Sequence, residues 1–304
     1  MDIEADEAAG TPPTCGEAMA RLRACLTVAI RHLIVLAMLC GAASGCRAAA
    51  PAAAASSEPP PPLIEPEVGP GAGLIDSRAD ALVRQMSDRL ARAAAFALEA
   101  EELYDEVPEH SPRRQLTSTR HVAMRRPDRL IGDTSGDAVN RSFWYDGKVF
   151  AVLDKEQHRW AGGTVPPTVD AALDWIFEQT GTVVPLADFL YADSYERLMG
   201  GVQRGEYLGI HEAAGVPCHH LAFEQATIDW QLWIDAGKDP LPRKLVITYK
   251  TEDEVPQYSV TIRKWNLTAR LPDELFVFTP PEGSSRVDVP ALARRAEPRA
   301  GGAK

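Results

Sequence analysis

The chain has 304 residues, of which 45% are hydrophobic and 25% are charged, and its formal net charge is -11. This composition is that of a soluble globular protein and excludes a chain of several membrane spans. The negative charge also excludes non-specific nucleic-acid binding, which requires Lys and Arg to displace counterions from phosphates. We therefore expect a folded protein with no nucleic-acid partner.

The first 45 residues have the pattern of a bacterial secretory signal. Arg21, Arg23 and Arg31 precede an apolar run over residues 33–39, after which small residues lead to Cys46. A membrane-spanning helix needs about 20 apolar residues, and this run is shorter. We therefore expect a cleaved signal peptide rather than a permanent transmembrane helix.

Residues 1–18 do not resemble the start of a secretory signal, because they are acidic and contain Pro12-Pro13. A secretory signal begins with a positively charged segment. We therefore expect translation to start at Met19, with residues 1–18 being an extension of the gene model.

Cys46 stands where a lipid anchor would be attached. The residues Ala43-Ser44-Gly45-Cys46 resemble the bacterial lipobox, whose Cys is linked to diacylglycerol and becomes the new N-terminus. Several acyl chains together hold a protein stably on a membrane. Because Arg47 replaces the Asp that indicates inner-membrane retention, we expect an exported outer-membrane lipoprotein that faces the periplasm. The alternative is a simple signal peptide or an uncleaved anchor, with Cys46 incidental.

The positions of the five cysteines limit disulfide formation. Cys15, Cys25, Cys40 and Cys46 all lie in the first 46 residues, and the fifth is Cys218. Once the leader is removed, acylated Cys46 and Cys218 remain, so no disulfide can form within the chain. We expect the apolar core to stabilise the fold.

Two segments lack the apolar periodicity of packed elements. Residues 46–73 are rich in Ala and Pro, including Glu58-Pro59-Pro60-Pro61-Pro62, and are expected to form a tether. Such a tether reaches on the order of 80 Å when it is extended. Residues 288–304 are polar and rich in Ala, Arg and Gly, which predicts a disordered tail. One folded domain is therefore expected over residues 74–287.

The first half of this domain reads as a helix followed by strands. Leu82, Met86 and Leu90 recur at the spacing of one helix face. Loose alternation predicts strands over 96–104 and 116–124 and a third that starts near residue 129. Hairpins are predicted over 143–150, with a two-residue turn at Asp146-Gly147, and over 154–160.

Helices interrupt the strands before a second block of strands begins. Thr168 is placed to cap a helix over 169–177 that stops at Gly181, and shorter helices are predicted over 185–191 and 193–199. Clear alternation over 228–234, 245–249 and 258–262 predicts three strands with a shared apolar face. A last strand is predicted over 275–278, ending at Pro280-Pro281.

Cys218-His219-His220, with His211 nearby, could be interpreted as a metal site or as a Cys–His nucleophile. On a strand, however, Cys218 and His220 lie on one face and His219 on the other, and no CxxC or HExxH motif completes a ligand set. We therefore favour a buried Cys218 and structural histidines. A metal-dependent enzyme at Cys218 and His220 is the least favoured alternative, and we expect neither catalysis nor a cofactor.

Several motifs in one order resemble a bacterial family described only as a predicted periplasmic protein. They include residues 125–130, 145–148, 215–223, 229–234 and 240–244, and the likeness covers roughly residues 78–285. The family is similar to the periplasmic lipoprotein carriers and outer-membrane lipoprotein receptors. This resemblance implies an α+β fold, in which helices cover the concave face of a strongly curved antiparallel half-barrel.

Strand residues of the chain could line a hydrophobic pocket, since ligand cavities are mostly apolar. The candidates are Trp144, Phe150, Phe223, Trp230, Leu232, Ile247 and Val260. We expect non-catalytic binding of a lipid, of a lipoprotein acyl chain or of an envelope protein. The alternative is a structural or scaffold envelope lipoprotein whose concavity is filled by its own side chains.

Overall fold

The computed structural model describes residues 74–108, 112–180, 184, 186–251 and 255–289. The predicted signal peptide, the anchor at Cys46 and the linker lie outside these residues. So do the helix stop at Gly181 and most of the predicted tail.

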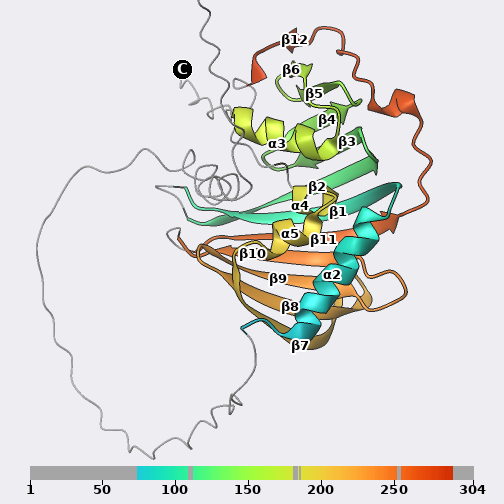
Figure 1. Ribbon diagram of the computed structural model, residues 1–304. Helices are drawn as coiled ribbons and strands as arrows, with labels where there is room; N and C mark the ends of the chain where they lie inside the picture. Colours follow the sequence, from blue (N-terminus) through green and yellow to red (C-terminus); the bar gives the residue numbers. More distant parts are fainter. Residues whose placement is uncertain (1–73, 109–111, 181–183, 185, 252–254, 290–304) are drawn as a thin grey trace, which may run out of the picture.

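Within the described residues, one twelve-stranded sheet forms the body of the protein (Figure 1). Its order is β12-β6-β5-β4-β3-β2-β1-β11-β10-β9-β8-β7, and every neighbouring pair is antiparallel except β12 with β6. The strands are β1 (Ala95–Glu106), β2 (Arg114–Arg125), β3 (Arg129–Gly136), β4 (Asn140–Tyr145), β5 (Val149–Asp154), β6 (Arg159–Thr164), β7 (Val202–Ala213), β8 (Val216–Gln225), β9 (Ile228–Asp235), β10 (Pro242–Tyr249), β11 (Gln257–Asn266) and β12 (Ser285–Arg286).

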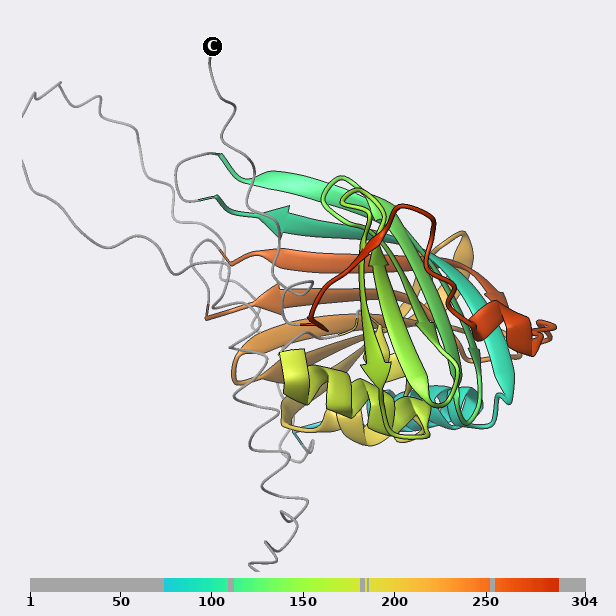
Figure 2. The same ribbon diagram turned by 90° about the horizontal axis from the view of Figure 1, so that it is seen from above.

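The sheet is strongly curved, and bulges contribute to the curvature. The register shifts at Glu99/Ala100 between β1 and β11, at Pro242/Lys244 between β10 and β9, and at Tyr207/Gly209 between β7 and β8. An extra residue in one strand of a pair bends that strand and increases its twist. Figure 2 shows the sheet curving around the helices.

Four helices lie on the concave side of the sheet (Figures 1 and 2). They are α2 (Ser77–Ala91), α3 (Val169–Thr180), α4 (Ala187–Leu190) and α5 (Ser194–Met199). Asp76 caps α2 by accepting from the amides of Arg78 and Ala79, and Thr168 accepts from the amide of Ala171 at the start of α3. The predicted fold class, a curved antiparallel sheet with helices on its concave face, is confirmed. No helix of the described residues is long and apolar enough to cross a membrane.

Alternation places one apolar set of each strand under the helices. Phe96, Leu98 and Ala100 of β1 are buried there, as are Val260 and Ile262 of β11. The helices add Met86 and Leu90 from α2, Leu173 and Ile176 from α3, and Phe189 from α4. Strands and helices therefore share one core.

Two local predictions are wrong. The tight turn after β4 is centred on Gly147 and Lys148, because the Asp146 amide bonds to the Val149 carbonyl and only Gly147 there has a positive φ. The predicted strand over 275–278 is instead the 3-10 helix η1 (Asp273–Phe276) followed by an extended segment. Phe276 and Phe278, two positions apart in this segment, pack on the outer face of the sheet. A segment that lies flat on a sheet can show the alternation of a strand without pairing with a neighbouring strand.

Candidate functional site

The concave face brings together six of the seven predicted pocket residues. Trp230 of β9 lies in register with Phe223 of β8 on one side and with Ile247 of β10 on the other. The rings of Phe223 and Trp230 stack with centroids 4.2 Å apart. Leu232, Val260 and Phe150 belong to the same buried cluster. This face is a continuous apolar wall, and its use as a ligand site stays a prediction.

Trp144 is the exception, because it lies on the outer face. Its strand neighbours Phe143 and Tyr145 face the core, so alternation turns Trp144 outward, in register with Ala151 of β5. There its ring contacts Phe278, with centroids 5.0 Å apart. The run Phe143-Trp144-Tyr145 is aromatic throughout, so its sequence alone does not indicate which ring points inward.

We call the four helices over the concave face the roof. Most of the roof consists of α3, α4 and α5, which follow one another between β6 and β7 and take no part in the sheet. Phe189 of α4 is fully buried, and Leu190, Leu173 and Leu198 also face the sheet. The roof therefore seals the apolar wall with its own side chains.

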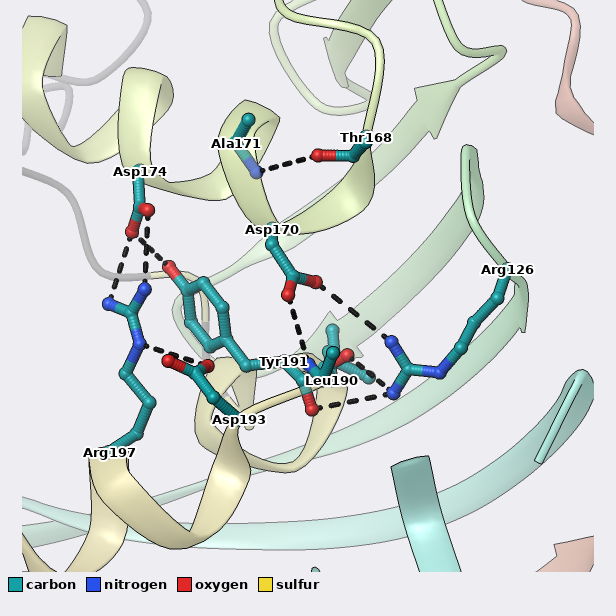
Figure 3. A network of polar contacts seen from close by, with 10 residues as sticks. Arg126, Thr168, Asp170, Ala171, Asp174, Leu190, Tyr191, Asp193 and Arg197 are labelled. Carbon is teal, nitrogen blue, oxygen red and sulfur yellow. Dashed lines mark hydrogen bonds and ion pairs between the residues drawn. The ribbon is translucent and has the colours of Figure 1, made fainter. Parts of the chain in front are cut away.

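Arg126, at the end of β2, fastens the roof to the sheet (Figure 3). Its Nη2 donates to the carbonyls of Leu190 and Tyr191 at 3.0 and 3.4 Å, and its Nη1 lies 3.9 Å from Asp170 of α3. Asp170 in turn accepts from the amide of Ala192. Burial lowers the pKa of Arg126, and the charge of Asp170 opposes this effect. A cation thus replaces sheet pairing as the link between roof and wall.

A second cluster joins the helices of the roof to each other. Arg197 of α5 donates to both carboxylate oxygens of Asp174 of α3, at 3.1 and 3.2 Å, and lies 3.8 Å from the centre of the Tyr191 ring. The Tyr191 hydroxyl also donates to Asp174 (Figure 3). Burial raises the pKa of Tyr191, and Asp174 raises it further. The hydroxyl therefore stays protonated and holds this bond at neutral pH.

The two ends of the roof meet where α2 packs on α5. Arg84 of α2 donates to the Tyr195 hydroxyl at 2.5 Å and lies over its ring, while that hydroxyl donates to Asp80. The contacts of Arg126, Arg197 and Arg84 lie at the margin of the roof. Two backbone hydrogen bonds, from Asp76 to the Gly205 carbonyl and from Val169 to the Pro127 carbonyl, also join the roof to the sheet. Breaking the contacts of the three arginines would leave the hydrogen bonds of the sheet intact.

Besides Nε of Arg126, three buried polar groups beneath or within the roof have no hydrogen-bond partner among the described residues. They are the hydroxyls of Ser87 in α2 and Ser194 in α5 and the indole N–H of Trp230. All three residues are at most 4% exposed. Buried polar groups are normally satisfied, and an unsatisfied one costs about 1–3 kcal/mol. A polar atom of a bound ligand could form the hydrogen bonds that these groups lack.

One charged cluster lies on the otherwise apolar wall. Glu102 of β1, only 3% exposed, accepts from Arg120 at 2.7 and 3.0 Å and from the hydroxyls of Ser118 and Tyr258 at 2.8 Å each. Burial alone would raise the pKa of Glu102, but Arg120 and the two hydroxyls hold it below its usual value. This cluster was not predicted from the sequence, since its members come from three strands.

Cys218 and His220 lie together on the outer face, as alternation predicted, and His219 lies on the other face. His220 accepts or donates at 2.8 Å to His211, bonds to Gln231 at 3.0 Å, and stacks on Trp233. Burial raises the pKa of the Cys218 thiol to about 11, which is the opposite of an activated nucleophile. Among the described residues, no group of three or more His, Cys, Asp or Glu side chains is placed to hold a metal ion.

The fold and the site together define an open half-barrel with a helix-covered concave face. The chain belongs to the family described as "Predicted periplasmic protein (DUF2092)", whose model matches residues 79–290. The predicted family is thereby confirmed. No curated protein matches the chain in sequence.

Solved structures share the outline of this fold. An uncharacterized conserved protein from Thermus thermophilus is 9% identical with a TM-score of 0.41, covering 70% of this chain and 99% of that one. The lipoprotein LppX of Mycobacterium tuberculosis is 13% identical with a TM-score of 0.38, covering 65% and 100%. The MucA/MucB complex of Pseudomonas aeruginosa gives 12% and 0.38, covering 66% and 62%. Likenesses this distant describe the fold alone and say nothing of a shared ligand.

Proposed function

We propose that this protein is a non-catalytic binding protein of the bacterial envelope, which holds a hydrophobic ligand between the concave wall and the roof. The ligand is an acyl chain of a lipid or of a lipoprotein. One observation carries the proposal: a sheet-wide apolar face is covered by helices that are fastened at their margins by a few ion pairs and hydrogen bonds. The part of the cover from α3 to α5 takes no part in the sheet and can lift without breaking its pairing, whereas α2 stays joined to β7 through the bridge between Ile75 and Gly205.

The unsatisfied groups of Ser87, Ser194 and Trp230 support the proposal, because they provide donors inside an apolar space. An acyl chain carries ester or amide carbonyls near one end, and these carbonyls accept hydrogen bonds. Apolar burial provides most of the binding energy, at about 25 cal/mol per Å². The donors would orient the ligand.

The test is titration of the delipidated protein with palmitate and with lysophosphatidylcholine while its melting temperature is measured. A ligand at 100 times its Kd stabilises the folded state by about 2.7 kcal/mol. Ile247 on the wall and Val246 on the outer face are adjacent and both half-buried, which makes them matched positions. We expect Ile247→Gln to abolish the ligand-induced shift and Val246→Gln to keep it. Equal shifts in both variants, or none in the wild type, would refute acyl binding at this wall.

A scaffold without a ligand is the second candidate, and the full burial of Leu232, Val260 and Phe189 favours it. In that case the concavity is filled permanently by the protein itself. Native mass spectrometry of protein extracted from its own membrane distinguishes the two functions. Co-purifying lipid supports the binding protein, and a bare polypeptide mass with no thermal response supports the scaffold.

The membrane anchor at Cys46 is part of the proposal. We expect the mature protein to begin at Cys46 with diacylglycerol attached, to fractionate with the outer membrane, and to become soluble in the periplasm when Cys46→Ser is introduced. Intact-mass measurement and density-gradient fractionation check both points. Soluble wild-type protein without acyl mass would contradict the anchor and would leave the binding test unaffected.

A further inference from the structure

A separate cavity lies on the outer face of the sheet, opposite the roof. Its volume is about 420 Å³, within the range of small-molecule sites. The floor is formed by Trp144 of β4, Ala151 of β5 and Trp160 of β6. One side is closed by the chain that follows η1, which we call the strap (residues 277–286). Figure 1 shows this chain, in red, running from η1 to β12.

The strap already places an aromatic ring on the indoles of the cavity floor. Phe278 lies between the two indoles, with ring centroids 5.0 Å from Trp144 and 5.2 Å from Trp160. The cavity continues from this aromatic contact towards the half-exposed Val149 and Val277. The remaining space therefore offers indole and aliphatic surface to an apolar group that enters from solvent.

A cation stands at the rim of the cavity. The Arg286 guanidinium lies 5.2 Å from the centre of the Trp160 ring and donates from Nη2 to the carbonyl of Gly162 at 3.0 Å. Its other N–H groups donate no hydrogen bond to the described residues. The acidic group of the lining, Asp146, already accepts from the amides of Lys148 and Val149. Arg286 is thus the cationic donor that the rim offers to an anion, while Oδ2 of Asp146 remains an open acceptor elsewhere in the lining.

We propose that this cavity is a second binding site, for small carboxylates with an apolar body. The body packs on Trp144 and Trp160 beside Phe278, and the carboxylate pairs with Arg286. Two sources share this chemistry, an aryl acid and a short fatty acid. Because the site lies on the opposite face of the sheet, it does not depend on the function proposed for the roofed wall.

Indole N–H signals in ¹H–¹⁵N spectra of the full chain provide the test, with 4-phenylbutyrate, octanoate and the neutral 4-phenylbutanol as probes. We expect saturable shifts of the Trp144 and Trp160 signals, assigned from Trp→Phe variants, while the buried Trp230 signal of the concave wall stays in place. A carboxylate should bind up to about fivefold tighter than the alcohol, since Arg286 is exposed and an exposed ion pair contributes up to about 1 kcal/mol. Tighter binding of 4-phenylbutyrate than of octanoate identifies the aryl acid as the preferred source, and the reverse order identifies the fatty acid.

Two variants with matched controls test the assignment. Val149→Trp should fill the mouth of the cavity and weaken binding at least about tenfold, the loss of roughly one ring contact. Leu208 on the edge strand β7 is about as exposed as Val149, and Leu208→Trp should not weaken binding. Arg286→Gln should remove the preference for the carboxylate, and Arg204→Gln on β7 should keep it. The absence of saturable shifts, unchanged binding in Val149→Trp, or a shift of Trp230 instead would each overturn the proposal.

Discussion

At the scale of single residues, Glu102 is the most buried carboxylate of the described part of the chain. A buried ion pair gains little over an apolar pair of the same size, but removing one partner leaves the other charge uncompensated. The two carboxylate oxygens of Glu102 together accept four hydrogen bonds, and the side chain of Arg120 is itself only 13% exposed. The cluster thus fixes the register of β1 with β2 and β11 at one point.

We predict that Glu102→Gln lowers the free energy of unfolding by about 3–5 kcal/mol, the usual cost of breaking a buried pair. Urea unfolding at pH 7 measures this loss. Glu101→Gln is the matched control, since its partner Arg263 and Glu101 are both half-exposed, and its cost should be below about 1 kcal/mol. Similar costs at the two positions would show that the cluster at Glu102 is not energetically distinct.

The pH dependence of stability follows from the same carboxylate. Because the pKa of Glu102 is lower in the folded than in the unfolded state, its contribution is complete above the unfolded pKa of about 4.3 and is lost as the pH falls through the folded pKa. We predict that the wild type and Glu102→Gln converge in stability in this acidic range. Urea midpoints between pH 7 and pH 3 test it, and parallel curves would disagree with the prediction.

At the scale of elements, the roof and the strap both lie on the sheet without extending it by more than two residues. The roof is fastened through Arg126 and Arg197, and the strap through Phe278 and Arg286. Elements held in this way open locally at a lower free energy than the central strands. This difference is what a movable cover requires.

We predict that Arg197→Gln speeds amide exchange over residues 169–199 about fivefold, because a partly exposed ion pair contributes about 1 kcal/mol. Exchange in β9 and β10 should stay unchanged. Arg263→Gln, on the exposed side of β11, should leave the roof unaffected. Uniformly faster exchange throughout the sheet would mean that the roof does not open by itself.

The strap gives a second prediction at this scale. Phe278→Ala removes the ring between two indoles and should cost about 1–3 kcal/mol, less than a fully buried Phe would. We expect faster proteolysis after residue 270 and increased solvent exposure of Trp144 and Trp160, measured by acrylamide quenching. An unchanged quenching profile would indicate that the strap is held without Phe278.

At the scale of the whole molecule, one continuous sheet connects the first and last strands that the structure describes. The central β1 pairs with β2 on one side and with β11 on the other, so both halves of the chain meet in it. A single core cluster spans both halves. This arrangement favours cooperative unfolding.

We therefore predict one calorimetric transition for the folded part. Leu130→Ala in β3 and Leu232→Ala in β9 should each lower the same melting temperature, at a cost of about 2–5 kcal/mol. Both side chains are almost fully buried, and they lie on opposite sides of β1. Two resolved transitions, each sensitive to only one substitution, would contradict a single cooperative unit.

Local patterns in the sequence determined the elements with a strong period. Alternation over 228–234, 245–249 and 258–262 matches β9, β10 and β11, and Thr168 starts α3 as its position predicted. These features depend on the residues of one segment, because side-chain period and capping are local properties of the backbone. The edge strand β7 was not predicted, since Gly205 and Gly209 interrupt its alternation.

The tertiary structure decided what depends on distant partners. It turned Trp144 outward. It laid Phe276 and Phe278 on the outer face of the sheet, although the segment 275–278 had been predicted to pair as a strand. It also joined Arg126 to Leu190, 64 positions away. Period and propensity say that a side chain is apolar or charged, whereas packing and charge pairing select its partner. The sequence patterns thus determined strands and helices in their order, and the family resemblance implied a curved antiparallel sheet. Only the folded chain established which faces are sealed and which side chains seal them.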